Sequence, residues 1–121
     1  MTAAKLSEYG RSFQIKAIYA LLTNKKFLQK IADILNVDYF DSPSHKWIVE
    51  KILAYFSKYN TYPTMEVLKI ELKKLKSKDE LLSVAVKKDL KEAYTSLHED
   101  SEYVEEEFDM FCRNQKLKAV S

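Results

Sequence analysis

Glycine is almost absent from this chain, since Gly10 is the only one among 121 residues. Phosphate-binding loops of the P-loop and dinucleotide types need several glycines at fixed spacing, because their backbone approaches the phosphates closely. Tight two-residue hairpins also favour glycine, and the sequence has no Asn-Gly, Asp-Gly or Gly-Gly pair. The scarcity of glycine therefore excludes both loops and disfavours an antiparallel β fold.

Cysteine and long apolar runs are equally scarce. Cys112 is the only cysteine, so no internal disulfide can form. No run approaches the roughly 18 apolar residues of a membrane-spanning helix, and the N-terminus lacks the apolar segment of a signal peptide. We expect a soluble, cytoplasmic protein without a membrane partner.

Arginine is the third deficit. The basic residues comprise eighteen lysines but only Arg11 and Arg113, and the net charge is +2. Sequence-specific DNA recognition relies on the planar fork of arginine, so the composition disfavours it. The charge is unevenly placed: residues 1–30 hold six basic residues against one acidic residue, and residues 92–121 hold eight acidic against three basic. The two ends are electrostatically opposite.

The residues that are present favour an all-α fold. Hydrophobic residues make up 46% of the chain, which is enough for one compact core. Their spacing is helical and predicts helices over about 13–22, 25–35, 43–59, 65–76 and 81–97. Asn24, Ser42 with Pro43 behind it, and Thr64 are typical of helix starts, and Ser77 to Glu80 fits a capping box. With the terminal segment we expect a bundle of about six helices.

Three regions are predicted along the chain. Residues 1–12 lack a sustained period and contain the only glycine, which predicts a flexible arm ending in an N-cap at Ser12. Residues 13–98 form the globular helical domain. Residues 99–121 form a C-terminal helix.

The C-terminal helix carries two apolar stripes. At about 100° per residue, the two stripes lie roughly 100–120° apart on the helix surface. A helix packed on one side of its own domain needs a single stripe, so we expect this helix to meet more than one neighbour. The first stripe is Val104, Phe108 and Phe111, and the second is Tyr103, Met110 and Leu117.

The polar residues offer little for catalysis or metal binding. His45 and His98 are far apart and lack partners at metal-ligand spacing, so a surface or helix-end position is expected for each. Cys112 is interpreted as a small buried hydrophobe. The acids 105–107 and Asp109 point in different directions on a helix, which favours a solvated face. We expect no catalytic, cofactor or metal-binding residue.

A lysine-rich segment is the best candidate for an electrostatic patch. It is interpreted either as the solvated side of an amphipathic helix or as a contact with nucleic-acid backbone or an acidic partner. The second interpretation leaves an alternative function open, that of a small helical nucleic-acid-binding module, although stacking aromatics are not interleaved. The residues are Lys69, Lys73, Lys74, Lys76 and Lys78.

Several short motifs together resemble the N-terminal domain of DnaB-type replicative helicases, especially of the phage-like branch. The resemblance covers residues 13–121. The motifs are FQIKAIYALL at 13–22, Phe27-Leu28, DYFDS at 38–42, Lys46-Trp47-Ile48, YNTYPT at 59–64, and the stretch from Tyr103 to Arg113.

The resemblance implies a function in assembly rather than chemistry. Domains of this family pair through a helical hairpin, form a collar on a hexameric ring, and dock primase or a helicase loader during DNA replication. The C-terminal helix would be the first arm of that hairpin, and the chain would end inside it. The implied partner contacts are Tyr103, Val104, Phe108, Phe111 and Leu117.

The resemblance also implies that this chain is not itself an enzyme. ATP and Mg²⁺ would be bound by a C-terminal motor domain, making the longer protein an ATP-dependent DNA helicase in the cytoplasm of a bacterial or phage-infected cell. DNA would be contacted weakly, or through the full ring.

Overall fold

The computed structural model describes residues 3–120, with only the backbone of Val120; residues 1, 2 and 121, which belong to the predicted arm and terminal helix, lie outside the described residues. Within that range the regular structure consists of six α-helices and two short 3-10 helices, with no strand. The predicted all-α bundle of six helices is confirmed. The elements are η1 (Leu6–Tyr9), α1 (Arg11–Thr23), α2 (Lys25–Ile31), η2 (Val37–Tyr39), α3 (Pro43–Tyr59), α4 (Met65–Lys78), α5 (Glu80–Thr95) and α6 (Ser101–Val120).

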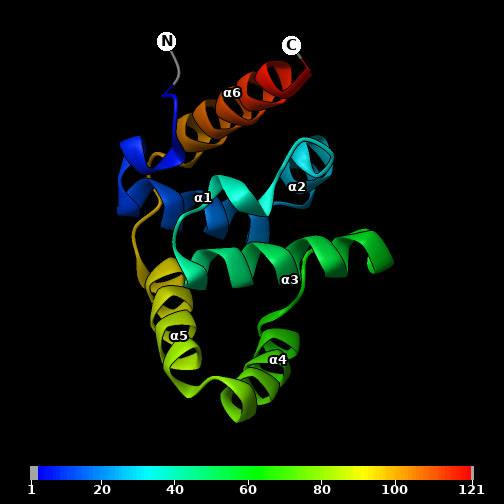
Figure 1. Ribbon diagram of the computed structural model, residues 1–121, viewed down its shortest axis with the longest axis vertical. Helices are drawn as coiled ribbons and strands as arrows, with labels where there is room; N and C mark the ends of the chain where they lie inside the picture. Colours follow the sequence, from blue (N-terminus) through cyan, green and yellow to red (C-terminus); the bar gives the residue numbers. More distant parts are fainter. Residues whose placement is uncertain (1–2, 121) are drawn as a thin grey trace.

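The bundle has two distinct ends (Figure 1). Helix α6 lies across one end and packs on α1 and α2, whereas α4 and α5 form a hairpin at the opposite end. Between them α3 crosses the middle of the molecule, and α5 also packs against α1 and α3. Surfaces on α6 and on the α4–α5 hairpin therefore face away from each other.

The helix starts follow the predicted caps in three places. The side chains of Asn24, Ser42 and Thr64 each accept a hydrogen bond from the backbone N–H three residues later, and Pro43 occupies the first turn of α3. Each bond satisfies a donor that the first turn leaves without a partner in the helix.

Two predicted helix boundaries are wrong. Ser77 lies in the last turn of α4, where its hydroxyl donates to the carbonyl of Lys73, and α5 is capped by Asp79, which accepts from the N–H of Leu82 at 3.0 Å. The capping box predicted from Ser77 to Glu80 therefore does not form. Helix α2 ends at Ile31, four residues earlier than its apolar spacing predicted.

Residues 3–12 do not form an arm separate from the bundle. The side chain of Leu6 is buried in the core, and the ring of Tyr9 stacks on Phe13 with centroids 4.4 Å apart. Helix α1 begins at Arg11 with Gly10 as its N-cap, so the cap predicted at Ser12 is wrong. The apolar surface buried by Leu6 and Tyr9 favours this packing over an extended arm.

The predicted boundary after residue 98 does not separate two units. Phe108 of α6 is fully buried and lies near Phe27 and Phe40, with ring centroids 6.4 and 6.1 Å away. Phe111 is also buried and meets Tyr39 edge-on at 5.6 Å. Helix α6 is thus one wall of the single core.

Candidate functional site

The structure divides the five predicted partner contacts on α6. Val104, Phe108 and Phe111 are buried in the chain's own core, so the prediction that they contact a partner is wrong. Tyr103 and Leu117 are exposed, with 66% and 68% of their residue surface accessible. The physical reason is that the first apolar stripe closes the core, which leaves the second stripe unused within the described residues.

The exposed side of α6 forms a continuous surface that we call the outer face. Met110, which belongs to the second stripe, is 51% exposed and lies between Tyr103 and Leu117 along the helix. Near Leu117 the surface is hollowed into a shallow pocket of about 280 Å³, which Ile34, Arg113 and Lys116 also line. At about 100° per residue, the outer face occupies roughly 100° of the helix circumference. Its residues are Glu102, Tyr103, Glu106, Met110, Arg113 and Leu117, and the charge of Arg113 is paired with Asp109 at 2.9 Å.

The solvated face predicted for residues 105–107 and Asp109 is wrong for three of these four acids. Asp109 is buried and pairs with Lys30 at 3.3 Å and Arg113 at 2.9 Å. Glu105 accepts hydrogen bonds from the side-chain amide of Asn24 at 3.1 and 3.2 Å, and Glu107 accepts one from the hydroxyl of Tyr9 at 2.8 Å. These bonds fasten α6 to the N-terminal part of the chain. Glu106, which lies between them in sequence, is exposed on the outer face.

Only three of the five predicted lysines lie together in the structure. Lys69, Lys73 and Lys76 line a groove of about 340 Å³ between α4 and α5. Lys74 does not line it; its ammonium lies 3.1 Å from the carboxylate of Glu71. Lys78, at the end of α4, is also outside the groove lining.

Sequence reasoning missed a fourth lysine of this groove. Lys87 reaches it from α5, together with Ser83, and Leu72 supplies apolar surface. The spacing of Lys69, Lys73 and Lys76 signalled a common face on one helix, but the neighbour across the groove depends on tertiary packing. We call this site the lysine groove, lined by Lys69, Leu72, Lys73, Lys76, Ser83 and Lys87. In the described part of the chain none of its four ammonium groups is within ion-pair distance of a carboxylate.

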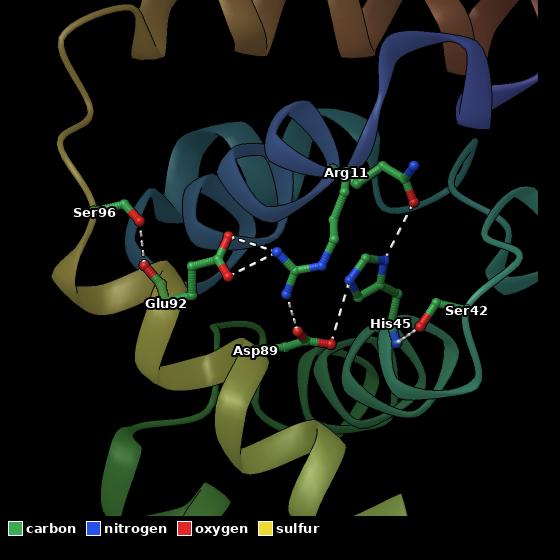
Figure 2. A network of polar contacts seen from close by, with 7 residues as sticks. Arg11, Ser42, His45, Asp89, Glu92 and Ser96 are labelled. Carbon is green, nitrogen blue, oxygen red and sulfur yellow. Dashed lines mark hydrogen bonds and ion pairs between the residues drawn. The ribbon is translucent and has the colours of Figure 1, made fainter.

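A third polar cluster lies inside the bundle (Figure 2). His45 lies in the first turn of α3, which is the helix-end alternative of its prediction, and its side chain is buried. Its Nδ1 lies 3.2 Å from Oε1 of Gln14, and its Nε2 lies 3.4 Å from Oδ2 of Asp89. Arg11 donates to both carboxylate oxygens of Glu92, at 2.7 and 2.8 Å, and to Asp89.

This cluster joins three helices. Its members come from α1, α3 and α5, and both His45 and Asp89 are buried. Burial raises the pKa of the Cys112 thiol to about 12, which disfavours the thiolate that a nucleophile requires. Among residues 3–120 no group of three or more potential ligands is placed to hold a metal ion.

His98 follows α5, as its helix-end prediction requires. Its ring stacks on Tyr19 with centroids 3.8 Å apart, and Nε2 lies 2.6 Å from the carbonyl oxygen of Ala93. The residue is half-buried and joins the end of α5 to α1.

His45 should make stability depend on pH. Burial is the largest influence and lowers its pKa below the ordinary 6.5; Arg11 acts in the same direction and Asp89 opposes it. The unfolded chain therefore binds this proton more readily, so the stabilisation present above 6.5 is lost as the pH falls below that value. Urea unfolding at a series of pH values should show this slope in the wild type and a flatter one in His45→Gln. An unchanged slope in His45→Gln would contradict the assignment.

Comparison with protein-family models, with curated proteins and with solved structures gave no match. No helix among the described residues is both long and apolar enough to cross a membrane. The function therefore has to be argued from the surfaces described above and from the resemblance in the sequence.

Proposed function

We propose that this chain is a non-catalytic assembly domain of the kind found at the N-terminus of DnaB-type replicative helicases. In this role it pairs with neighbouring subunits in the collar of a ring and helps dock primase or a helicase loader. One observation carries the proposal: α6 closes the core with one apolar stripe and exposes a second, made of Tyr103, Met110 and Leu117.

Exposure of the second apolar stripe to water is unfavourable in free energy. Fully burying a side chain of this size is worth about 1.5–3 kcal/mol, and each of the three is more than half exposed. Scattered apolar residues are ordinary on a protein surface, but a row along one helix is typical of an interaction site.

The proposal assigns no chemical step to this chain. ATP and Mg²⁺ would act in a motor domain of the longer protein, and DNA would be engaged by the assembled ring. Hydrolysis of ATP by the purified chain, persisting after contaminating ATPases are excluded, would contradict the assignment.

Self-association should depend on the outer face of α6. Met110→Glu combined with Leu117→Glu should weaken association measured by sedimentation velocity by about tenfold or more, because a charge replaces apolar contact at each site. Far-UV circular dichroism should stay unchanged, since both side chains are exposed.

Leu97→Glu is the control for placing one new charge on an exposed leucine away from α6. Leu97 is 78% exposed but follows α5 rather than lying on α6, so the same chemical change there should leave association intact. A wild-type chain that stays monomeric at high concentration, or a double variant that associates normally, would count against the proposal.

A further inference from the structure

We propose that the outer face of α6 in one copy of the chain binds the lysine groove between α4 and α5 of a second copy. This inference rests on the proposed assembly function and names the surface that receives α6. It is a head-to-tail contact, in which each copy presents its outer face of α6 to one neighbour and its lysine groove to another.

The first argument is the distribution of unpaired acids. Seven acidic residues lie between positions 99 and 109. Four of them have partners inside the chain: Asp100 with Lys16, Glu105 with Asn24, Glu107 with Tyr9 and Asp109 with Lys30. The other three, Glu99, Glu102 and Glu106, have no hydrogen-bond or ion-pair partner among residues 3–120, and two of these belong to the outer face of α6.

The second argument is the complementary character of the lysine groove. Four lysines without carboxylate partners surround it, and Leu72 and the lysine stems provide apolar surface between the charges. The outer face of α6 has the matching pattern, with Tyr103 and Met110 on either side of Glu106 along the helix. An amphipathic helix in an apolar groove with charges of the opposite sign at its rim is a common mode of recognition.

The third argument is the placement of the two surfaces. Helix α6 and the α4–α5 hairpin lie at opposite ends of the molecule (Figure 1), so a chain cannot bring its own outer face to its own groove. A contact between two different surfaces of identical subunits is heterologous. Such a contact leaves one face and one groove free on each pair, and it continues until a ring closes or a filament grows.

The groove suits a protein helix better than nucleic acid. Its lining contains no aromatic residue on which a base could stack and no arginine, and single-strand binding surfaces use both. A nucleic-acid backbone is therefore treated as the competing outcome of the experiment.

The test uses charge reversal on each surface. The groove variant carries Lys69→Glu and Lys73→Glu, and the face variant carries Glu102→Lys and Glu106→Lys. Each variant alone should associate at least about tenfold more weakly than the wild type in sedimentation velocity, because like charges then meet across the interface. An equimolar mixture of the two variants should recover association, since each altered surface finds an oppositely charged one on the other chain.

A control variant makes the same change in net charge as the groove variant, but outside both surfaces. Lys25→Glu with Lys88→Glu alters exposed lysines on α2 and α5 that line neither the groove nor the outer face. It should associate like the wild type. Should the groove variant lose helical structure by circular dichroism, Lys69→Ala with Lys73→Ala replaces it, because alanine favours helix.

The outcomes separate this inference from the proposed function. If the face variant associates more weakly but the groove variant associates like the wild type, the inference is overturned and assembly through α6 still stands. A mixture of the two variants that does not recover association also overturns the inference. A wild-type chain that does not associate overturns both. Steeply salt-dependent binding of single-stranded DNA that only the groove variant loses, with its self-association unchanged, overturns the inference in favour of a nucleic-acid site.

Discussion

Replacing Phe108 by alanine should lower the free energy of unfolding by about 3–5 kcal/mol, the range observed for large aromatic residues in protein cores. Phe108 is fully buried and lies between Phe27 of α2 and Phe40, which precedes α3. Alanine would leave a cavity at the place where α6 meets the rest of the bundle. Equilibrium unfolding in urea, followed by circular dichroism, measures the loss.

Met110→Ala provides the matched comparison on the same helix. Met110 is half-exposed on the outer face, so its truncation should change the free energy of unfolding by less than about 0.5 kcal/mol in the isolated chain. In an associated state Met110→Ala should be more destabilising than it is in the isolated chain, because Met110 would then be covered. Equal losses from Phe108→Ala and Met110→Ala in the monomer would contradict the assignment of the two stripes.

The contrast between these residues shows what could be read from the sequence. Spacing alone placed Phe108 and Met110 in two separate stripes, and both stripes are confirmed as separate surfaces. Spacing could not tell which stripe packs inward, because the two are similar in size and hydrophobicity. That choice depends on which stripe finds Phe27 and Phe40, and those contacts are remote in sequence.

The same limit explains the other differences. Local signals predicted the caps at Ser42 and Thr64 correctly, because a cap bond spans three residues. They failed for Leu6, which is buried although no periodic pattern of apolar residues surrounds it in the sequence. They also missed the place of Lys87 in the groove and the burial of His45, since the partner groups of both come from other helices.

The proposed assembly also accounts for the charge pattern that the small net charge hides. The acidic last quarter is partly neutralised inside the chain by residues such as Lys16 and Lys30, and what remains faces outward on α6. The lysine groove belongs to a different part of the sequence and to the opposite end of the molecule. Two surfaces of opposite charge on one subunit favour an ordered head-to-tail assembly over random association.

Removing the carboxylate of Asp89 should be the second large perturbation. Asp89→Ala takes away a buried carboxylate that accepts a hydrogen bond from Arg11 and lies 3.4 Å from Nε2 of His45, a nitrogen that has no hydrogen-bond partner even in the wild type. We expect a loss of about 1.5–3 kcal/mol in the free energy of unfolding, the usual net contribution of a hydrogen bond to a charged group. The loss should stay below that of a fully buried ion pair, because Arg11 is half-exposed and keeps its bonds to Glu92.

Glu92→Ala is the control that isolates burial as the cause. Glu92 also pairs with Arg11, but its side chain is 35% exposed, against 9% for Asp89. Water can take its place beside the guanidinium, so its removal should have the smaller effect on urea unfolding. Asp89→Ala should also deepen the pH dependence more than Glu92→Ala, because Asp89 is the larger of the two carboxylate influences that raise the pKa of His45 against the effect of burial. Equal losses from the two variants, with no change in pH dependence, would mean that the cluster is held by the surface pair of Arg11 and Glu92 alone.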